Sequence, residues 1–85
     1  MAYQAKAQAG DILILVHKGQ NIHAEVLKIV NDDQDESKVR ISVHFTQGLF
    51  KGRGHDLLAV VRKGGEYIFP REVIGLVPKN LAPAA

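Results

Sequence analysis

The side chains best suited to bind a partner lie in one glycine-rich segment, residues 48–55. Two of them are cations, which bind phosphate groups, and a phenylalanine beside them can stack on a base. A large apolar side chain at a loop tip can instead anchor a protein interface. The candidate contact residues of this segment are Leu49, Phe50, Lys51, Arg53 and His55.

A strand is predicted directly before this segment, over residues 38–45. Its odd-numbered residues are apolar and its even-numbered residues are polar or charged. A period of two residues is typical of a strand with one face in the core. Lys38 and Arg40 then lie on the solvent face, and we expect them to extend the cations of residues 48–55 into a basic stripe.

The segment does not have the pattern of a nucleotide-hydrolysing phosphate loop. Such a loop ends in Gly-Lys-Ser/Thr at the start of a helix, whereas Gly52 is followed by Arg53 and no helix is predicted. Nucleophilic catalysis needs a hydroxyl or thiol beside a base, but Ser37 lies in an acidic loop and Ser42 in mid-strand. We therefore expect no enzymatic activity and no cofactor.

An acidic loop at residues 31–37 holds four carboxylates and raises the question of a calcium site. An EF-hand loop needs glycine at its sixth position and glutamate at its twelfth. Counting from Asp32, these positions hold Ser37 and Val43, and counting from Asp33 supplies neither residue. The four histidines lack a close ligand spacing, and there is no cysteine. We expect a hairpin connection here and no metal site.

Length and composition indicate one intracellular domain. The 85 residues include no cysteine, which disfavours a disulfide-stapled secreted domain and favours a cytoplasmic protein. No apolar run approaches the ~18 residues of a membrane-spanning helix, so we expect no membrane partner. Residues 1–37 hold three Lys/Arg against six Asp/Glu, and residues 38–85 hold eight against three. This asymmetry favours an anionic partner for the second part of the chain.

Short strands separated by turns account for most of the chain. Residues 12–16 are apolar on both faces, which predicts a strand buried on both sides. Within residues 22–30 the apolar phase changes at Leu27 and Ile29, which predicts a β-bulge or bend. Further strands are expected at residues 57–61, 66–69 and 74–77, with a hairpin turn at Gly64-Gly65 and a tight turn at residues 70–73.

All-β chains of this size hide their strand edges by closing into a small barrel. We expect a flexible tail at residues 1–9, a five- to six-stranded barrel at residues 10–78 and a disordered tail at residues 79–85.

The order of these segments resembles the SH3-like barrels, especially the Tudor, chromo-barrel and KOW branches. The matching pieces are residues 10–15, 24–29, 39–45 and 69–74. The resemblance implies an all-β SH3-like barrel that binds or docks rather than catalyses. It does not extend to the aromatic cage in which Tudor and chromo-barrel readers hold methylated residues, because the segment after the third strand reads Thr-Gln-Gly-Leu.

Two functional hypotheses follow. The first is protein–protein docking by an adaptor, accessory subunit or small inhibitor, of the kind found in phages and mobile elements, with another protein or a second copy of the chain as partner. A thin barrel buries one face of a strand, so the second apolar face of residues 12–16 needs a cover, and Leu49 and Phe50 offer an anchor.

The alternative is weak, salt-dependent binding of DNA or RNA through residues 48–55 with Lys38 and Arg40.

Overall fold

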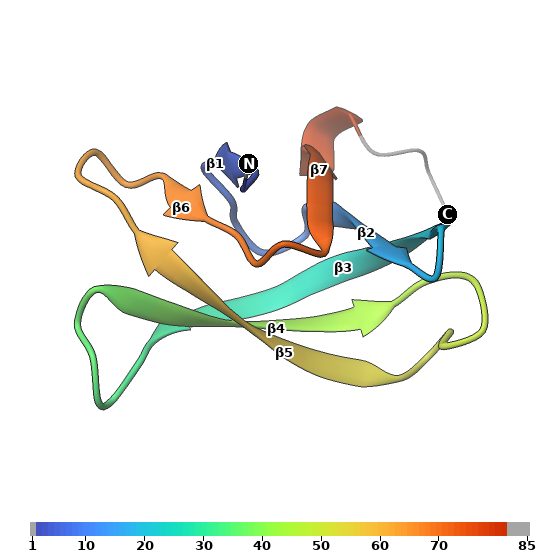
Figure 1. Ribbon diagram of the computed structural model, residues 1–85, viewed down its shortest axis with the longest axis horizontal. Helices are drawn as coiled ribbons and strands as arrows, with labels where there is room; N and C mark the ends of the chain where they lie inside the picture. Colours follow the sequence, from blue (N-terminus) through green and yellow to red (C-terminus); the bar gives the residue numbers. More distant parts are fainter. Residues whose placement is uncertain (1, 82–85) are drawn as a thin grey trace.

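The computed structural model describes residues 2–81, which form strands and one short 3-10 helix (Figure 1). The strands are β1 (Gln4–Ala5), β2 (Ile12–His17), β3 (Gln20–Asn31), β4 (Lys38–Phe45), β5 (Gly54–Val61), β6 (Tyr67–Ile68) and β7 (Val73–Val77), and the 3-10 helix η1 spans Lys79–Leu81. The all-β prediction is confirmed, and the described residues hold more strands than the five or six expected.

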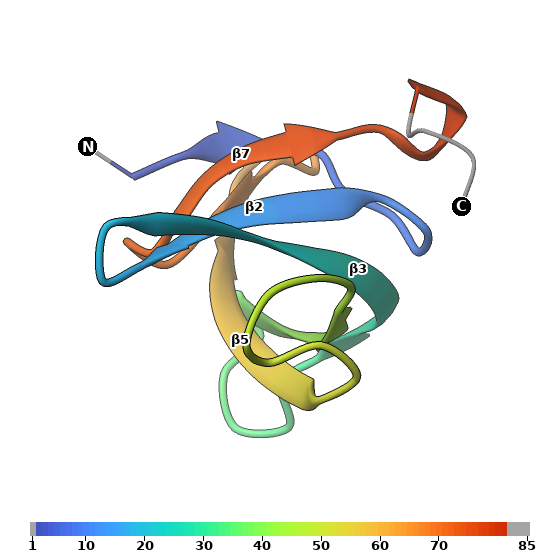
Figure 2. The same cartoon turned by 90° about the vertical axis from the view of Figure 1, so that its right-hand side faces the viewer.

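All of these strands belong to one antiparallel sheet in the order β1-β6-β5-β4-β3-β2-β7. Strands β2 to β5 form a meander, and the chain then returns so that β7 pairs with β2. Figures 1 and 2 show the twisted sheet curling until its two end strands, β1 and β7, lie near each other. The result is a nearly closed small barrel, compatible with the SH3-like class.

The predicted bulge in β3 is confirmed. The register of β3 against β4 shifts between Val26 and Lys28, so Leu27 is the extra residue. The side chain of Leu27 is exposed, whereas Ile29 packs against the core again. A bulge bends and twists a strand, and here it lies midway along the longest strand of the described sheet.

The core is one cluster inside the barrel. Alternate residues of β2, β3, β4 and β5 point inward, as the period of two predicts. The buried apolar side chains are Leu13, Leu15, Ile22, Ala24, Val26, Val39, Ile41, Val43, Leu57, Ala59, Phe69 and Val73.

Strand β2 buries one face rather than two. Leu13 and Leu15 point into the core, whereas Ile12, Ile14 and Val16 are only half-buried. The prediction of burial on both sides is wrong because the barrel wall is a single sheet, and no second layer covers the outer side of β2 in the described residues.

Residues 2–9, which we expected as a flexible tail, lie against the barrel. Strand β1 pairs with β6, and the amide of Phe69 donates to the carbonyl of Tyr3 at 3.0 Å. Tyr3, Ala5 and Ala7 pack against the core at alternate positions. At the other end, the first part of the expected tail forms η1, and residues 82–85 lie outside the described residues.

The carboxylate of Asp11 connects both ends of the chain to the start of β2. Its two oxygens accept hydrogen bonds from the amides of Gln8 at 2.9 Å and Lys79 at 2.8 Å, and its carbonyl accepts from the amide of Val26 at 2.8 Å. The side chain is 3% exposed. Gly10 precedes it with a φ of 96°, and a Cβ there would come within 2.6 Å of the Lys79 side chain.

We expect Asp11→Ala to lower the free energy of unfolding by about 3 kcal/mol, because it leaves two amide donors of a buried site without their charged acceptor. Asp11→Asn should also be destabilising, since its amide group turns a donor toward one of those N–H groups. Urea denaturation followed by circular dichroism measures both. Asp33→Ala, an exposed carboxylate of the acidic loop, is the control and should change stability by less than about 0.5 kcal/mol. An Asp11→Ala protein as stable as this control would contradict the prediction.

Candidate functional site

A hollow opens at the end of the barrel where β2 and β4 end and β3 and β5 begin, and Figure 2 looks toward this end. Its volume is about 410 Å³. Its buried and half-buried lining residues are Leu15, Val16, Ile22, Phe45 and Phe50, and its exposed ones are His17, Arg53, Gly54, His55 and Glu72. We call this site the aromatic hollow.

Four rings form a connected cluster in the aromatic hollow. The ring centroid of Phe50 lies 5.2 Å from that of His17, edge to face, and 5.6 Å from that of Phe45. Phe45 in turn stacks on His55 at 6.0 Å. Phe45 is the last residue of β4, so its inward-pointing side chain reaches the barrel end and stays half-buried. The ring cluster therefore belongs partly to the core and partly to the surface.

Loop 46–53 holds one side of the hollow through backbone hydrogen bonds. The amide of Phe45 donates to the carbonyl of Arg53 at 2.9 Å, and the amide of Gly52 donates to the carbonyl of Phe45 at 2.8 Å. A further turn is closed by the amide of Arg53, which donates to the carbonyl of Phe50 at 2.9 Å. Gly52 has a φ of 86°, in the left-handed region that glycine adopts without strain. The glycines of this loop thus support tight turns.

Leu49 lies at the tip of this loop. Its side chain is 88% exposed, the highest value among the large exposed apolar residues described. Its neighbour Phe50 lines the hollow instead. The loop therefore presents one large apolar side chain to solvent directly beside an aromatic hollow.

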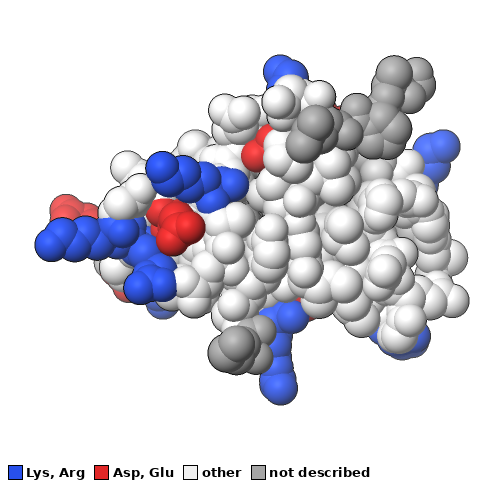
Figure 3. All heavy atoms as spheres, turned by 90° about the horizontal axis from the view of Figure 1, so that it is seen from above, with Lys and Arg blue, Asp and Glu red and all other residues white. Residues whose placement is uncertain are grey.

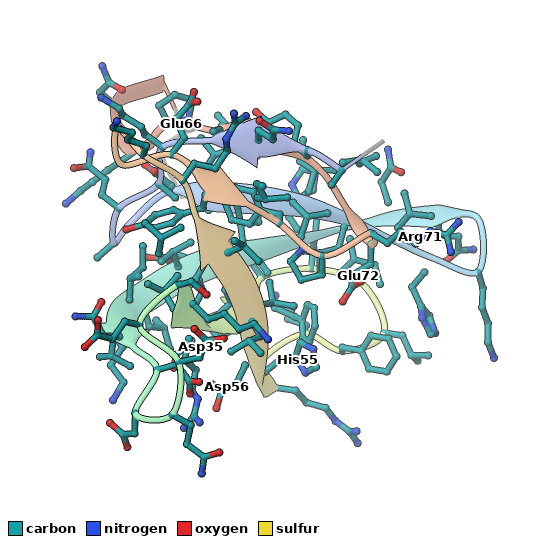
Figure 4. All side chains as sticks on the ribbon, turned by 60° about the vertical axis from the view of Figure 1, so that its left-hand side comes forward. Asp35, His55, Asp56, Glu66, Arg71 and Glu72 are labelled. Carbon is teal, nitrogen blue, oxygen red and sulfur yellow. The ribbon has the colours of Figure 1, made fainter. Side chains whose placement is uncertain are left out.

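Arg53 and Glu72 place opposite charges on different walls of the hollow. Arg53 ends loop 46–53 next to β5, and Glu72 lies in the turn before β7, where its carbonyl accepts from the amide of Val16 at 2.8 Å. Figure 4 shows Glu72 and His55 lying toward the same end of the barrel. Neither Arg53 nor Glu72 belongs to the ion pairs found within residues 2–81.

The structure brings five of the seven predicted contact residues together and separates the other two. Leu49, Phe50, Lys51, Arg53 and His55 lie at the barrel end, in loop 46–53 or at the start of β5.

Lys38 and Arg40 lie toward the opposite end of β4. Lys38 pairs with Val60 and His55 pairs with Val43, which separates the two sites by roughly 17 Å at ~3.4 Å per residue. Both cations also face acidic side chains, Lys38 at 3.8 Å from Asp35 and Arg40 at 3.8 Å from Asp32. The two groups of cations do not form a continuous stripe.

Another face of the molecule likewise shows no basic stripe. In Figure 3, which views the barrel from above, several Lys and Arg side chains gather at the left end with acidic side chains among them, the others lie singly at the rim, and the right half of this face is mostly uncharged.

The sequence patterns did not predict two of the exposed residues that line the aromatic hollow, His17 and Glu72, as contact residues. His17 is the last residue of β2 and Glu72 lies in the turn before β7, so the two are far apart in the sequence and far from loop 46–53. Each is the sequence neighbour of a buried or half-buried strand residue, but no short-range sequence pattern links either of them to loop 46–53. Only the return of β7 to β2 brings Glu72 to this end of the barrel.

A second hollow, of about 580 Å³, lies on the outer side of β2, β3 and β7. Ile12, Leu27 and Val77 line it together with Glu25, whose carboxylate lies 3.1 Å from Nε2 of His44. This is the uncovered outer face of β2. The carboxylate of Glu25 is already paired across β3 and β4, and the exposed apolar side chain that lines this hollow, Leu27, comes from the bulge of β3 rather than from a loop tip.

Within residues 2–81, no three His, Asp or Glu side chains gather closely enough to hold a metal ion. The same part of the chain has no helix of the length and apolar character needed to cross a membrane. Comparisons with protein-family models, curated proteins and solved structures find no match for this chain.

The acidic loop holds one carboxylate with a shifted pKa. The hydroxyl of Ser37 donates to Oδ1 of Asp35 at 2.6 Å and its amide donates at 2.9 Å, and these bonds, with the nearby charge of Lys38, hold the pKa of Asp35 below its ordinary value of 3.8. A lowered pKa in the folded state stabilises the fold above the unfolded pKa. That contribution is lost as the pH falls through the folded pKa.

We expect Ser37→Ala to raise the pKa of Asp35 toward its ordinary value, because the hydroxyl bond favours the charged carboxylate. NMR titration of the Asp35 carboxyl carbon between about pH 2 and pH 6 measures the change. Ser42→Ala removes a hydroxyl that donates to Asp56 at 3.0 Å instead, and it should leave the Asp35 titration unchanged. Identical Asp35 titrations in Ser37→Ala and wild type would refute the assignment.

Proposed function

We propose that this protein is a non-catalytic protein-docking module, an adaptor or small inhibitor of phage or mobile-element type, that binds its partner at the barrel end formed by loop 46–53 and the aromatic hollow. The observation that carries the proposal is the exposure of Leu49. A leucine that is 88% exposed at a loop tip is an apolar anchor of the kind that protein interfaces bury.

The surroundings of Leu49 support the same function. The loop is closed by backbone hydrogen bonds, so binding would order few additional backbone torsions. The hollow beside it offers apolar and aromatic surface at the centre and single charges at the rim, which is the usual arrangement of an interface. The Tudor, chromo-barrel and KOW barrels, to which we relate the strand order, are likewise binding modules.

Weak binding of DNA or RNA is the second candidate function. Lys51 and Arg53 are exposed on the loop that carries Phe50, so two phosphate contacts could accompany one stacked base. Lys38 and Arg40 lie at the other end of β4 beside carboxylates, and they would not add to this site. Among the Lys and Arg residues of the described chain, only Arg53 lines the aromatic hollow, and it shares that lining with the carboxylate of Glu72, which favours the docking function.

We expect peptides selected from a display library on the immobilised full chain to bind at the barrel end. A selected peptide should shift the amide NMR signals of residues 46–55 and His17, and Leu49→Ser should weaken its binding at least about tenfold. Leu58→Ser is the matched control, because Leu58 is 48% exposed on the outer side of β5. Both variants should keep the wild-type melting temperature. Peptides that bind Leu49→Ser as well as wild type would argue against the proposed surface.

A mixed DNA/RNA oligonucleotide separates the two candidate functions. Under the docking proposal, the amide signals of residues 48–56 should not move at about 0.15 M salt, because two cations give little phosphate affinity at that ionic strength. Nucleic-acid binding would move them at about 0.02 M salt, and Lys51→Ala with Arg53→Ala would abolish the shifts. Shifts that persist at the higher salt concentration would favour nucleic acid as the partner.

A further inference from the structure

We propose that the partner of this surface is a second copy of the same chain, in a two-fold dimer in which Leu49 of each copy enters the aromatic hollow of the other. The inference rests on the proposed docking function and names its partner. Three features of the barrel end support it: an apolar projection beside an apolar hollow, opposite charges on facing walls, and a rigid loop.

The first feature is self-complementary shape. A two-fold interface uses the same patch on both copies, so a projecting residue and the cavity that receives it must lie on the same patch. Leu49 projects from loop 46–53, and the next residue, Phe50, lines the hollow. The hollow, at about 410 Å³, has room for a leucine side chain, and Leu15, Ile22 and Phe45 give it apolar walls.

The second feature is charge. Arg53 stands on the β5 side of the hollow and Glu72 on the β7 side, and in the described residues neither has an ion-pair partner within the chain. A two-fold axis can relate the two copies so that the β5 wall of one hollow lies against the β7 wall of the other. It therefore allows Arg53 of each copy to face Glu72 of the other, giving two equivalent ion pairs at the rim, around the apolar contact.

The third feature is the stiffness of the loop that carries Leu49. Hydrogen bonds between Phe45 and residues 52 and 53 join the base of the loop, and the amide of Lys51 donates to the carbonyl of Gly48 at 3.2 Å to close a turn around Leu49, so these bonds restrict the loop before any partner arrives. Association then costs little backbone conformational entropy in this loop. One end of a barrel measuring 32 × 28 × 24 Å is nevertheless a small interface, and we expect a reversible dimer in the micromolar range.

Sedimentation velocity on the full 85-residue chain, from about 10 µM to 1 mM, tests the dimer. The wild type should pass from monomer to dimer over this range. Leu49→Asp should weaken the association at least about 30-fold, because it places a carboxylate in an apolar hollow. Leu58→Asp puts the same charge on an exposed leucine away from this end and should leave the dimer unchanged.

Charge reversal tests the arrangement of the two copies. Arg53→Glu and Glu72→Arg should each weaken the dimer about tenfold, because like charges then face each other. The double variant Arg53→Glu with Glu72→Arg restores opposite charges across the axis and should associate within about threefold of wild type. Both residues are exposed, so circular dichroism should show unchanged folding in all three variants.

A wild type that is monomeric at every concentration would overturn the dimer, as would a dimer that survives Leu49→Asp or a double charge variant that stays as weak as the single variants. The docking function is judged separately by the selected peptides. Peptides that depend on Leu49 and bind a strictly monomeric chain would retain the docking function and discard the second copy as its partner.

Discussion

The hydrogen bonds of Asp11 determine how the barrel closes. One carboxylate holds the amides of Gln8 and Lys79, and the backbone of the same residue pairs with Val26 of β3. The segment before β2, the middle of β3 and the start of η1, which follows β7, are thereby fixed at one point. A buried carboxylate is tolerated there because donors surround it, and among the described residues no buried side-chain N or O atom lacks a partner. Closure at this point lets a single thin sheet enclose a core.

The aromatic hollow follows from the same architecture. A barrel wall of one sheet cannot cover its own ends, and inward-facing residues near a strand end remain half-buried, as Phe45 does. Loop 46–53 folds over part of this end and brings Phe50 against Phe45. The return of β7 to β2 supplies the opposite wall with Glu72. The hollow is thus assembled from the ends of several strands. Its position depends on the closure of the barrel, which Asp11 fixes at the opposite end of β2.

Most of the fold could be predicted from the sequence, because each strand carries its own local pattern. The alternation in residues 38–45 gave β4, and the phase change at Leu27 gave the bulge in β3. The candidate site was predicted only in part. Leu49, Phe50, Lys51, Arg53 and His55 are close in the sequence and lie close in space. Lys38 and Arg40 precede this group by only about ten residues in the sequence, but an extended strand carries them to the far end of the ladder. His17 and Glu72 depend on strand pairing, which local patterns do not report.

The distribution of charge favours a protein partner over a nucleic acid at the barrel end. A nucleic-acid site needs several cations along a path that follows the phosphates, whereas the lining of the hollow combines one such cation, Arg53, with the carboxylate of Glu72. A carboxylate on the opposite wall would repel a phosphate backbone but suits a protein surface that brings its own cation. Leu49 adds a second argument, because an exposed leucine gains little from a phosphate backbone and much from an apolar cavity. Apolar contact at the centre with single opposite charges at the rim is the pattern that protein interfaces use.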